Sequence, residues 1–186
     1  MPTKKELRAE VRQKLAEQNS RDRSARSGVI ATKLFKRKDF LEARRVCFYV
    51  STPTEVATEA MIDRALEMGK EILVPLTDLK NKTLLVYEIK DRKTDLVKGI
   101  LDIMEPRIEK AKPADVSSVD CVIVPGLVFD ETGNRIGQGV GLYDRFLKTV
   151  KPAASKLGLA FGFQMVPRIP VEDHDVPLTA VLTEFP

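Results

Sequence analysis

The chain has 186 residues, of which 43% are hydrophobic and 31% are charged, so it can bury an ordinary core and is neither disordered nor collagen-like. Its longest apolar runs are far shorter than the roughly 20 residues that a helix needs to cross a bilayer, and its N-terminal residues are charged rather than apolar as in a signal peptide. We therefore expect a single domain over residues 1–186, located in the cytoplasm and without a membrane partner.

The net charge of +4 is distributed unevenly along the chain. Residues 1–50 contain 14 Lys and Arg against 6 Asp and Glu, a net charge of +8, whereas the remainder has 17 against 21, a net charge of −4. Such a basic N-terminal part should attract an anion, either a small anionic ligand such as a nucleotide or a nucleic acid. No zinc finger, RNA-binding strand signature or Gly-Lys-Ser/Thr loop accompanies it, so the sequence favours the small ligand, and a nucleic-acid-associated protein is the weaker alternative.

Apolar residues recur at helical spacing in the first part of the chain. They predict one amphipathic helix over 3–18 and a second over 20–38, which Ser20 can cap. The residues expected to face the core are Leu7, Val11 and Leu15 in the first helix and Val29, Ile30 and Leu34 in the second.

From Arg45 onward, short β-rich runs alternate with helical segments. This alternation predicts an α/β protein with a three-layer, Rossmann-like fold, in which helices flank a mostly parallel central sheet. Residues 90–118 read as a connecting region rather than a linker between domains, since their apolar stretch 100–104 could still pack. Cys47 and Cys121 lie within strand-like runs and are expected to be buried and reduced. The predicted strands are 46–50, 72–75, 84–89, 121–125, 157–163 and 178–182, and the predicted helices are 58–68 and 143–150.

A glycine-rich segment follows the fourth predicted strand. Gly137, Gly139 and Gly141 occur at every second position, so backbone N–H groups can approach an anion closely before the next helix begins. Arg135 and Arg145 flank the glycines with permanent positive charge. The spacing matches neither a Walker loop nor the dinucleotide fingerprint. The segment is therefore either a phosphate cradle or a tight strand-to-helix turn that requires glycine.

Lys4, Arg8 and Arg12 occur four residues apart and would form one cationic ridge on the first helix. Like charges at this spacing repel by ~0.2–0.5 kcal/mol per pair. A bound triphosphate would relieve that repulsion. Position alone favours the other interpretation, an ordinary solvated helix face.

Two further segments contain candidate functional residues. Glu55 comes just after the first predicted strand, where parallel sheets place their ligands, but it also fits an exposed loop charge or a helix-terminal charge. His174 is the single histidine and lies among Glu172, Asp173 and Asp175. A metal ligand, a proton donor and a solvated acidic loop all explain His174, and it is left unassigned.

Taken together, six segments closely resemble the 5-formyltetrahydrofolate cyclo-ligase family, also called 5,10-methenyltetrahydrofolate synthetase. They occur in the order and at the spacings of that family and cover nearly the whole chain. The combination of Pro-Gly-x-x-Phe-Asp with Arg-x-Gly-x-Gly-x-Gly-x-Tyr-Asp is far more specific than a lone glycine motif. The segments are 4–8, 55–58, 105–106, 124–130, 134–145 and 163–164.

The resemblance implies an ATP-dependent ligase that forms a carbon–nitrogen bond. Enzymes of this family use ATP and Mg²⁺ to close a reduced folate, 5-formyltetrahydrofolate, into the 5,10-methenyl form, releasing ADP and phosphate. The implied path runs through a phosphorylated formyl group, an iminium phosphate, which N10 of the folate then attacks. The sequence fits a monomer and a homo-oligomer equally.

The resemblance also implies roles for individual residues. Catalysis would involve Arg135 and Tyr143, and Asp144 matches a magnesium ligand. The positions that match nucleotide contacts are Lys4, Arg8, Arg135, Gly137, Gly139 and Gly141, and those that match folate contacts are Glu55, Gln138, Gly139, Gly141 and Tyr143.

Three positions depart from the family pattern. Leu142 replaces the first tyrosine of a Tyr-Tyr-Asp motif, and Val140 lies where Gly or Lys is frequent. Thr179 lies where many members have an aspartate that helps to bind magnesium, so either magnesium binding is weaker here or Asp175 or water supplies the missing ligand. These departures leave an alternative, a family paralogue that binds nucleotide or folate without cyclo-ligase turnover.

Overall fold

The structure, a computed structural model, describes residues 2–99 and 103–185. The apolar stretch 100–104 lies mostly outside the described residues, and its two described members, Ile103 and Met104, are exposed rather than packed. The helices are α1 (Lys4–Glu17), α2 (Ser20–Leu34), α3 (Lys38–Glu42), α4 (Glu59–Glu67), α5 (Arg92–Asp95) and α6 (Leu142–Thr149), with 3-10 turns η2 (Val116–Ser118) and η3 (Gly162–Gln164).

A seven-stranded sheet runs through the centre of the molecule in the order β12-β10-β7-β1-β2-β3-β6. The pairs from β12 to β2 are parallel, and β3 and β6 add to one edge as antiparallel strands. The strands are β12 (Ala180–Leu182), β10 (Ser155–Leu159), β7 (Cys121–Val124), β1 (Arg45–Cys47), β2 (Glu71–Asp78), β3 (Thr83–Ile89) and β6 (Lys112–Ala114).

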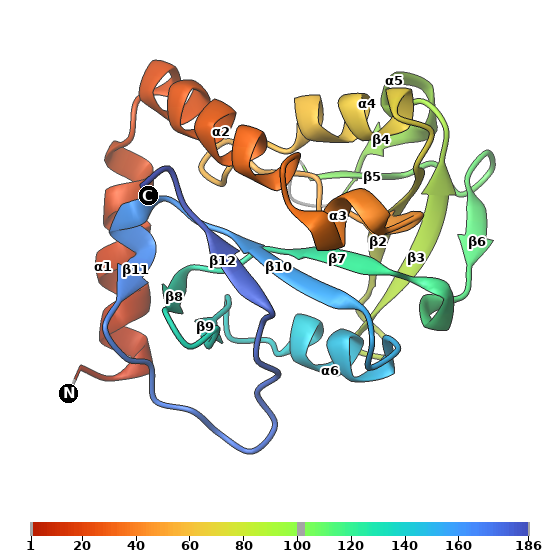
Figure 1. The fold of residues 1–186 in the computed structure, drawn as a ribbon. Coiled ribbons are helices and arrows are strands. Elements are labelled where there is room, and N and C mark those ends of the chain that lie inside the picture. Colours follow the sequence, from red (N-terminus) through yellow and green to blue (C-terminus); the bar gives the residue numbers. More distant parts are fainter. Residues whose placement is uncertain (1, 100–102, 186) are drawn as a thin grey trace.

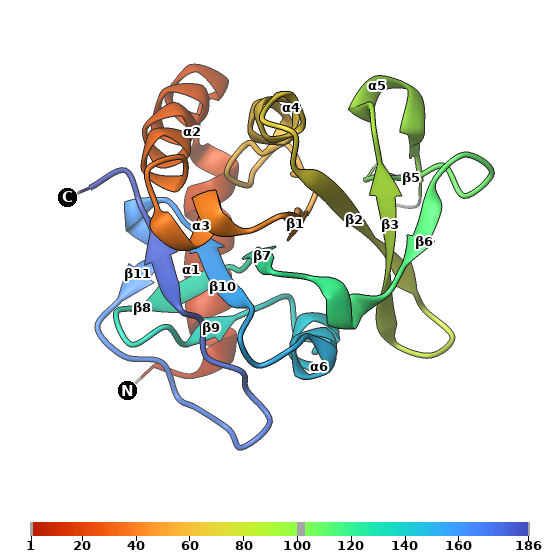
Figure 2. The ribbon, with the colours of Figure 1, turned by 45° about the vertical axis from the view of Figure 1, so that its right-hand side comes forward.

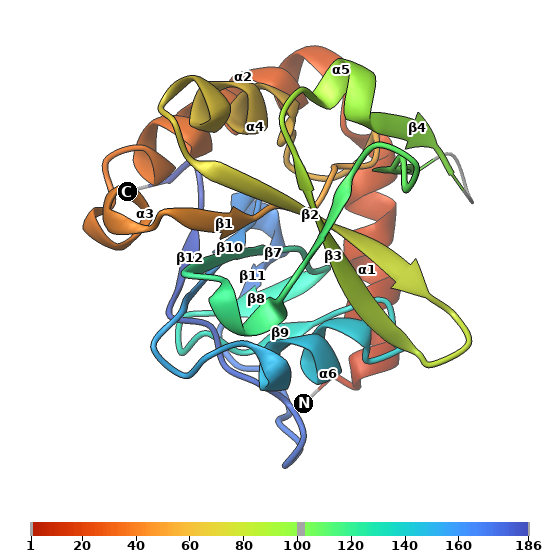
Figure 3. The same ribbon diagram turned by 90° about the vertical axis from the view of Figure 1, so that its right-hand side faces the viewer.

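Helices cover both faces of this sheet and so form the expected three layers. Figure 3 shows α2 and α4 on one side of the sheet and α6 on the other. Val46 and Ile72 pack with Ile30 of α2 in the first core, whereas Cys47 packs with Phe146 of α6 in the second. Successive strand residues point to opposite faces, so a strand between two helical layers is apolar throughout. The predicted α/β class with a mostly parallel sheet is confirmed.

The two cysteines are buried free thiols, as expected. Cys47 and Cys121 lie on neighbouring strands but belong to different cores, so their side chains point to opposite faces of the sheet. Burial raises the pKa of Cys121 to about 12 and raises the pKa of Cys47 as well. Both thiols are therefore protonated at neutral pH.

A smaller three-stranded sheet, in the order β11-β8-β9, lies beside α1 (Figure 1). Its strands are β8 (Val128–Asp130), β9 (Arg135–Ile136) and β11 (Met165–Val166). The sequence predicted no strand between the fourth strand and the α6 region. The buried carboxylate of Asp130 accepts hydrogen bonds from the turn that joins β8 and β9, which explains why this polar stretch folds into a hairpin.

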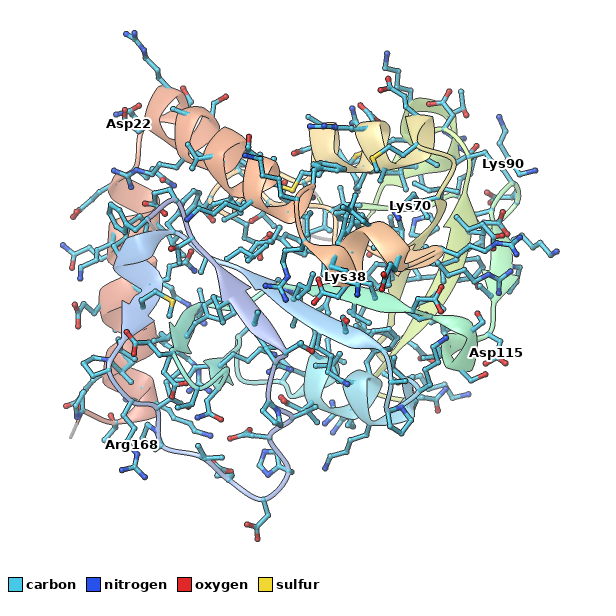
Figure 4. All side chains as sticks on the ribbon, viewed as in Figure 1. Asp22, Lys38, Lys70, Lys90, Asp115 and Arg168 are labelled. Carbon is cyan, nitrogen blue, oxygen red and sulfur yellow. The ribbon has the colours of Figure 1, made fainter. Side chains whose placement is uncertain are left out.

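The region expected as a connection carries short elements at one end of the molecule. There α5 leads into a two-stranded antiparallel sheet of β4 (Leu96–Lys98) and β5 (Met104–Pro106), and β5 contacts β2. Figure 2 shows α5 and β5 at the right-hand side of the molecule. Charged side chains such as Asp22, Lys90 and Arg168 stand at the periphery of the molecule (Figure 4).

The N-terminal helices differ from the prediction in their caps and ends. Asn19 caps α2 by accepting a hydrogen bond from the backbone N–H of Asp22 at 2.8 Å, whereas Ser20 is already helical. The helix ends at Leu34 and a separate helix, α3, begins at Lys38. Val29 is exposed rather than inward, because residues four apart share one helix face and Ile30 and Leu34 take the buried one. Leu7, Val11 and Leu15 of α1 are buried as predicted.

Several predicted strands are shorter than expected, among them 178–182, of which only Ala180–Leu182 is in β12. After β1 the chain remains buried over 48–50 but leaves the sheet and leads to the segment that carries Glu55. The strand predicted at 157–163 ends at Leu159 as β10. The chain then turns into η3, where the side chain of Gln164 accepts a hydrogen bond from the backbone N–H of Phe161 at 2.7 Å.

Candidate active site

Two adjoining clefts open at the edge where the parallel strands have their carboxyl ends. The first cleft has a volume of about 250 Å³ and is lined by residues that follow β1 and β7, such as Tyr49 and Pro125, and by Pro75 of β2. The second has a volume of about 380 Å³ and lies between α1, the start of α6 and the segment 172–175. The residues that line both clefts are Arg135, Gly137, Val140, Gly141 and Asp144.

Arg135 lies in the wall between the two clefts. It belongs to β9 and is 6% exposed, and its Nη1 donates to Oδ1 of Asp144 at 3.0 Å. Its Nε is buried with no hydrogen-bond partner among the described residues. Burial lowers the pKa of Arg135 and the charge of Asp144 opposes that effect, but a guanidinium remains protonated. The wall therefore carries a permanent cation that is paired with Asp144 but keeps a buried N–H group without a partner among the described residues.

The glycine-rich segment forms the rest of this wall. Gly139 and Gly141 have φ angles of 105° and 68°, which side chains rarely adopt, and Gly141 is the N-cap of α6. Gly137 has no such angle, and a Cβ built there would meet nothing within 4 Å. The requirement for glycine in a tight turn therefore explains residues 139 and 141 but not Gly137.

Helix α1 lies directly against the glycine-rich segment. Arg8 Nε donates to the carbonyl oxygen of Gly137 at 2.9 Å, and Arg12 Nη2 donates to Oε1 of Gln138 at 2.8 Å. Arg8 thus faces the second cleft, and the interpretation of the ridge as a mere solvated face is wrong for Arg8, whereas Arg12 is exposed and lines neither cleft. Arg8 lines the second cleft and Gln138 lines the first.

Lys4, one turn earlier on α1, also lines the second cleft but is engaged by carboxylates. Its Nζ lies 2.8 Å from Oε1 of Glu172 and 3.0 Å from Oδ2 of Asp175. Burial lowers the pKa of Lys4, but these two partners outweigh that effect and raise it. The cleft therefore contains a cation that is already arranged to hold negatively charged oxygens.

Glu55 and Tyr143 both line the first cleft, one from the turn after β1 and the other from α6. Oε2 of Glu55 accepts hydrogen bonds from the backbone N–H and the hydroxyl of Thr52, at 2.9 and 3.0 Å. Burial raises the pKa of Glu55, and it also raises that of Tyr143 well above its usual value. The two groups bring polar atoms into an otherwise largely apolar cleft.

The residues considered for magnesium lie in different places. Asp144 and Asp175 both line the second cleft, whereas Thr179 lines neither cleft and its hydroxyl accepts a hydrogen bond from the backbone N–H of Lys156. His174 is exposed at the rim of the second cleft. Within the described parts of the chain, no group of three or more His, Cys, Asp or Glu residues is arranged to hold a metal ion.

The structure brings together every residue named for the site from the sequence and adds three that sequence reasoning missed. Asp130 supports the β8–β9 turn, Gln164 Nε2 donates to the carbonyl oxygens of Gly126 and Leu127 at 3.0 Å, and Arg23 binds the turn that carries Glu55. Asp130 and Gln164 belong to segments on which the family resemblance rests, so the resemblance could have identified them. Nothing near Arg23 in the sequence indicated its partner.

Comparison with known proteins identifies the family. A sequence profile described as the 5-formyltetrahydrofolate cyclo-ligase family matches residues 1–184.

The chain belongs to this family.

Relatives among cyclo-ligases match over most of both chains. A probable 5-formyltetrahydrofolate cyclo-ligase of Caenorhabditis elegans is 30% identical, with 97% of this chain and 92% of the relative covered. The mouse 5-formyltetrahydrofolate cyclo-ligase is also 30% identical, with coverage of 97% and 93%. The NMR structure of Aquifex aeolicus 5,10-methenyltetrahydrofolate synthetase, also 30% identical, superimposes with a TM-score of 0.84 and covers 97% of this chain and 89% of that one. The protein is thus a member of a family of ligases that act in folate metabolism.

Over residues 2–99 and 103–185, no helix is both long and apolar enough to span a membrane.

Proposed function

We propose that this protein uses ATP to cyclise 5-formyltetrahydrofolate to 5,10-methenyltetrahydrofolate, with release of ADP and phosphate. The observation that carries the proposal is the pair of clefts that share Arg135 and the glycine-rich segment as a common wall. One cleft is largely apolar and suits a flat heterocycle, whereas the other is lined by charged side chains and suits a polyphosphate. A phosphoryl group bound at the shared wall would lie between the two ligands.

The second cleft is the proposed ATP site. Lys4 and Arg8 would bind the phosphates from α1, and Arg135 would bind them from the wall. Backbone N–H groups in the glycine-rich segment would contribute further donors, at Gly137, Gly139 and Gly141. Binding of the polyphosphate would replace Glu172 and Asp175 as the anionic partners of Lys4.

The first cleft is the proposed folate site. Glu55 is a carboxylate acceptor, and the amino-pyrimidine edge of a reduced pterin offers N–H donors that a carboxylate binds well. Tyr143 and Gln138 line the same cleft, next to Gly141 and close to Gly139, from which we expect contacts to the reacting end of the folate.

The proposed reaction needs positioning and charge stabilisation rather than a protein nucleophile. The formyl oxygen of the folate attacks the γ-phosphorus and ADP leaves. N10 then attacks the activated formyl carbon, inorganic phosphate leaves and N10 loses its proton. Arg135 would stabilise the charge on the transferred phosphoryl group, and Tyr143 would hold the folate beside it.

The acidic residues of the second cleft fit a magnesium ion that arrives with ATP. Mg²⁺ is commonly held by one or two carboxylates together with substrate phosphates rather than by a complete protein cage. Asp144 would contact the ion, and Asp175 lines the same cleft. When bound, the ion would neutralise charge on the phosphates. Thr179 lies outside both linings, so its difference from the family pattern gives no reason to expect weaker magnesium binding.

A turnover assay tests the proposal. Purified protein mixed with MgATP and 5-formyltetrahydrofolate should produce the near-UV absorbance of the methenyl product and one ADP per product. Omitting ATP, and replacing Arg135 by Gln, should each abolish both signals. Ligand-dependent thermal stabilisation without product or ADP would instead favour a paralogue that binds without turnover. Thr179→Asp should leave the magnesium dependence unchanged.

A further inference from the structure

The turn that carries Glu55 is held to helix α2 by a side chain that the proposed reaction does not use. We call residues 51–57 the Glu55 turn. Arg23 Nε donates to the carbonyl oxygen of Glu55 at 2.6 Å. Its Nη2 donates to the carbonyl oxygen of Thr52 at 3.0 Å and to Oγ of Ser51 at 3.3 Å. One planar guanidinium thus binds the Glu55 turn at two places, at residues 51–52 and at residue 55.

A second residue of α2 extends this attachment. Ser27, four residues after Arg23 and on the same helix face, is 4% exposed and its Oγ accepts a hydrogen bond from the backbone N–H of Ala57 at 3.0 Å. A buried polar side chain requires a partner, and the partner of Ser27 lies in the Glu55 turn, as do the partners of Arg23. The inward face of α2 is therefore built to hold this turn as well as to fill the core.

The carboxylate of Glu55 remains available because Arg23 binds the backbone instead. Among the described residues, hydrogen bonds to this carboxylate come from Thr52 and reach only Oε2. Oε1 is thus left for a ligand in the first cleft, which Glu55 lines. The guanidinium fixes the direction of the carboxylate without occupying it.

We propose that Arg23 is a positioning residue for Glu55, whose backbone contacts hold the Glu55 turn so that the carboxylate faces the donor-rich edge of the bound pterin. The inference rests on the proposed function, because it takes Glu55 as a folate contact. A small displacement of a binding group is enough to weaken its interaction strongly. Arg23 itself touches neither substrate in this arrangement.

The charge of Arg23 also acts on Glu55. Burial raises the pKa of Glu55, whereas the hydrogen bonds from Thr52 and the charge of Arg23 lower it, and nearby Glu59 raises it again. Loss of the Arg23 cation therefore raises the pKa of Glu55 further, so its carboxylate is protonated at a higher pH. Tyr49 and Tyr143 also interact with Glu55. Burial raises the pKa of each tyrosine well above its usual value.

The experiment compares Arg23→Gln with Arg21→Gln, which removes the same charge from an exposed position of the same helix. Arg23→Gln should raise the KM for 5-formyltetrahydrofolate about tenfold or more, as expected for lost charge-assisted hydrogen bonds. The KM for ATP and the kcat should stay within about twofold, because Glu55 binds the pterin equally in ground state and transition state. Arg21→Gln should resemble the wild type in all three.

Two further readouts separate positioning from a general structural role. In a Glu55→Gln background, adding Arg23→Gln should change the folate KM by less than about twofold, because residues that act through one another are not additive. On acidification, folate binding should weaken at a higher pH in Arg23→Gln than in Arg21→Gln. A full tenfold effect in the Glu55→Gln background, or superimposable pH profiles, would overturn the proposal.

The outcome for Arg23 is separable from the outcome for the proposed reaction. If the wild type bound 5-formyltetrahydrofolate without converting it, the proposed reaction would fail. The same variants compared by the Kd for 5-formyltetrahydrofolate would still test Arg23. An unchanged Kd in Arg23→Gln would then refute its positioning role.

Discussion

Asp130 shows how one buried residue supports the site without lining it. Its carboxylate accepts hydrogen bonds from the backbone N–H groups of Thr132, Asn134 and Ile169, each at 3.0 Å, and from the side chains of Thr132 and Asn134. These donors close the turn between β8 and β9 and attach it to the chain after β11. Arg135 directly follows this turn, so Asp130 fixes the strand that carries the charge between the clefts.

Asp130→Asn should destabilise the protein. The amide has the same size, but its NH₂ group cannot accept the hydrogen bonds that the second carboxylate oxygen receives, so we expect the free energy of unfolding to fall by about 2–4 kcal/mol at neutral pH. Urea unfolding measures this change. Glu131→Gln, at the exposed neighbouring position, is the matched control and should lower the free energy of unfolding by less than about 0.5 kcal/mol.

The effect of Asp130 on stability should depend on pH. Burial alone would raise the pKa of Asp130, but its hydrogen bonds outweigh burial and lower the pKa below its usual value. A carboxylate with a lowered folded pKa stabilises the protein fully above about pH 4, its unfolded value, and loses that contribution as the pH falls through the folded pKa. The difference between wild type and Asp130→Asn should therefore shrink on acidification. A constant difference from pH 7 to about pH 3 would contradict this account.

At the scale of elements, the connection from β9 to α6 combines two different uses of glycine. Gly139 and Gly141 provide backbone angles that the turn and the helix start require, whereas Gly137 keeps open space at the wall of both clefts. Hydrogen bonds from Arg145 to the carbonyl oxygens of Val140 and Lys82 brace this connection against the β2–β3 hairpin. Arg145, expected only as a charge beside the glycines, is thus also a structural clamp.

Alanine substitutions should separate these two uses. Gly139→Ala should lower the free energy of unfolding by about 1–2 kcal/mol, because a residue with a side chain is strained at a φ of 105°. The free energy of unfolding of Gly137→Ala should stay within about 0.5 kcal/mol of the wild-type value, because the added methyl group enters open space. If the segment binds phosphates through its backbone, Gly137→Ala should nevertheless raise the KM for ATP several-fold. Wild-type kinetics in Gly137→Ala would argue against close phosphate contact at this residue.

At the scale of the whole molecule, the site is assembled from segments that lie far apart in the chain. α1 supplies Lys4 and Arg8, the segment after β1 supplies Glu55, and the last third supplies the glycine-rich segment and Asp175. Leu7, Val11 and Leu15 bury the opposite side of α1 in the core, so packing of the first helix fixes its cations at the second cleft. Nucleotide binding should therefore stabilise the entire fold.

A non-hydrolysable ATP analogue with Mg²⁺ should raise the stability of the protein against unfolding. At a ligand concentration about 100-fold above Kd, the expected gain is about 2.7 kcal/mol, measured by denaturant unfolding with and without ligand. Arg8→Ala should lose most of this gain in stability, because the substitution weakens binding of the analogue. Lys14→Ala, on the exposed side of α1 where Lys14 pairs with Glu10, is the control and should keep it. Equal stabilisation of the two variants would remove Arg8 from the nucleotide site.

The sequence by itself determined the class of fold and the family, and it named the residues to which the proposed chemistry is assigned. Periodicity identified α1 and its buried face, apolar runs identified the parallel strands, and the motif around Gly137 identified the family, because each of these signals is local in the chain. Only the tertiary structure decided which surfaces meet: that the cations of α1 face the glycine-rich segment, that Thr179 lies away from both clefts, and that Arg23 holds the Glu55 turn. The β8–β9 hairpin also depended on partners distant in sequence, namely β11 and the chain at Ile169. Such contacts arise from the packing of whole elements, and a short sequence pattern carries no information about which distant segment will be the partner.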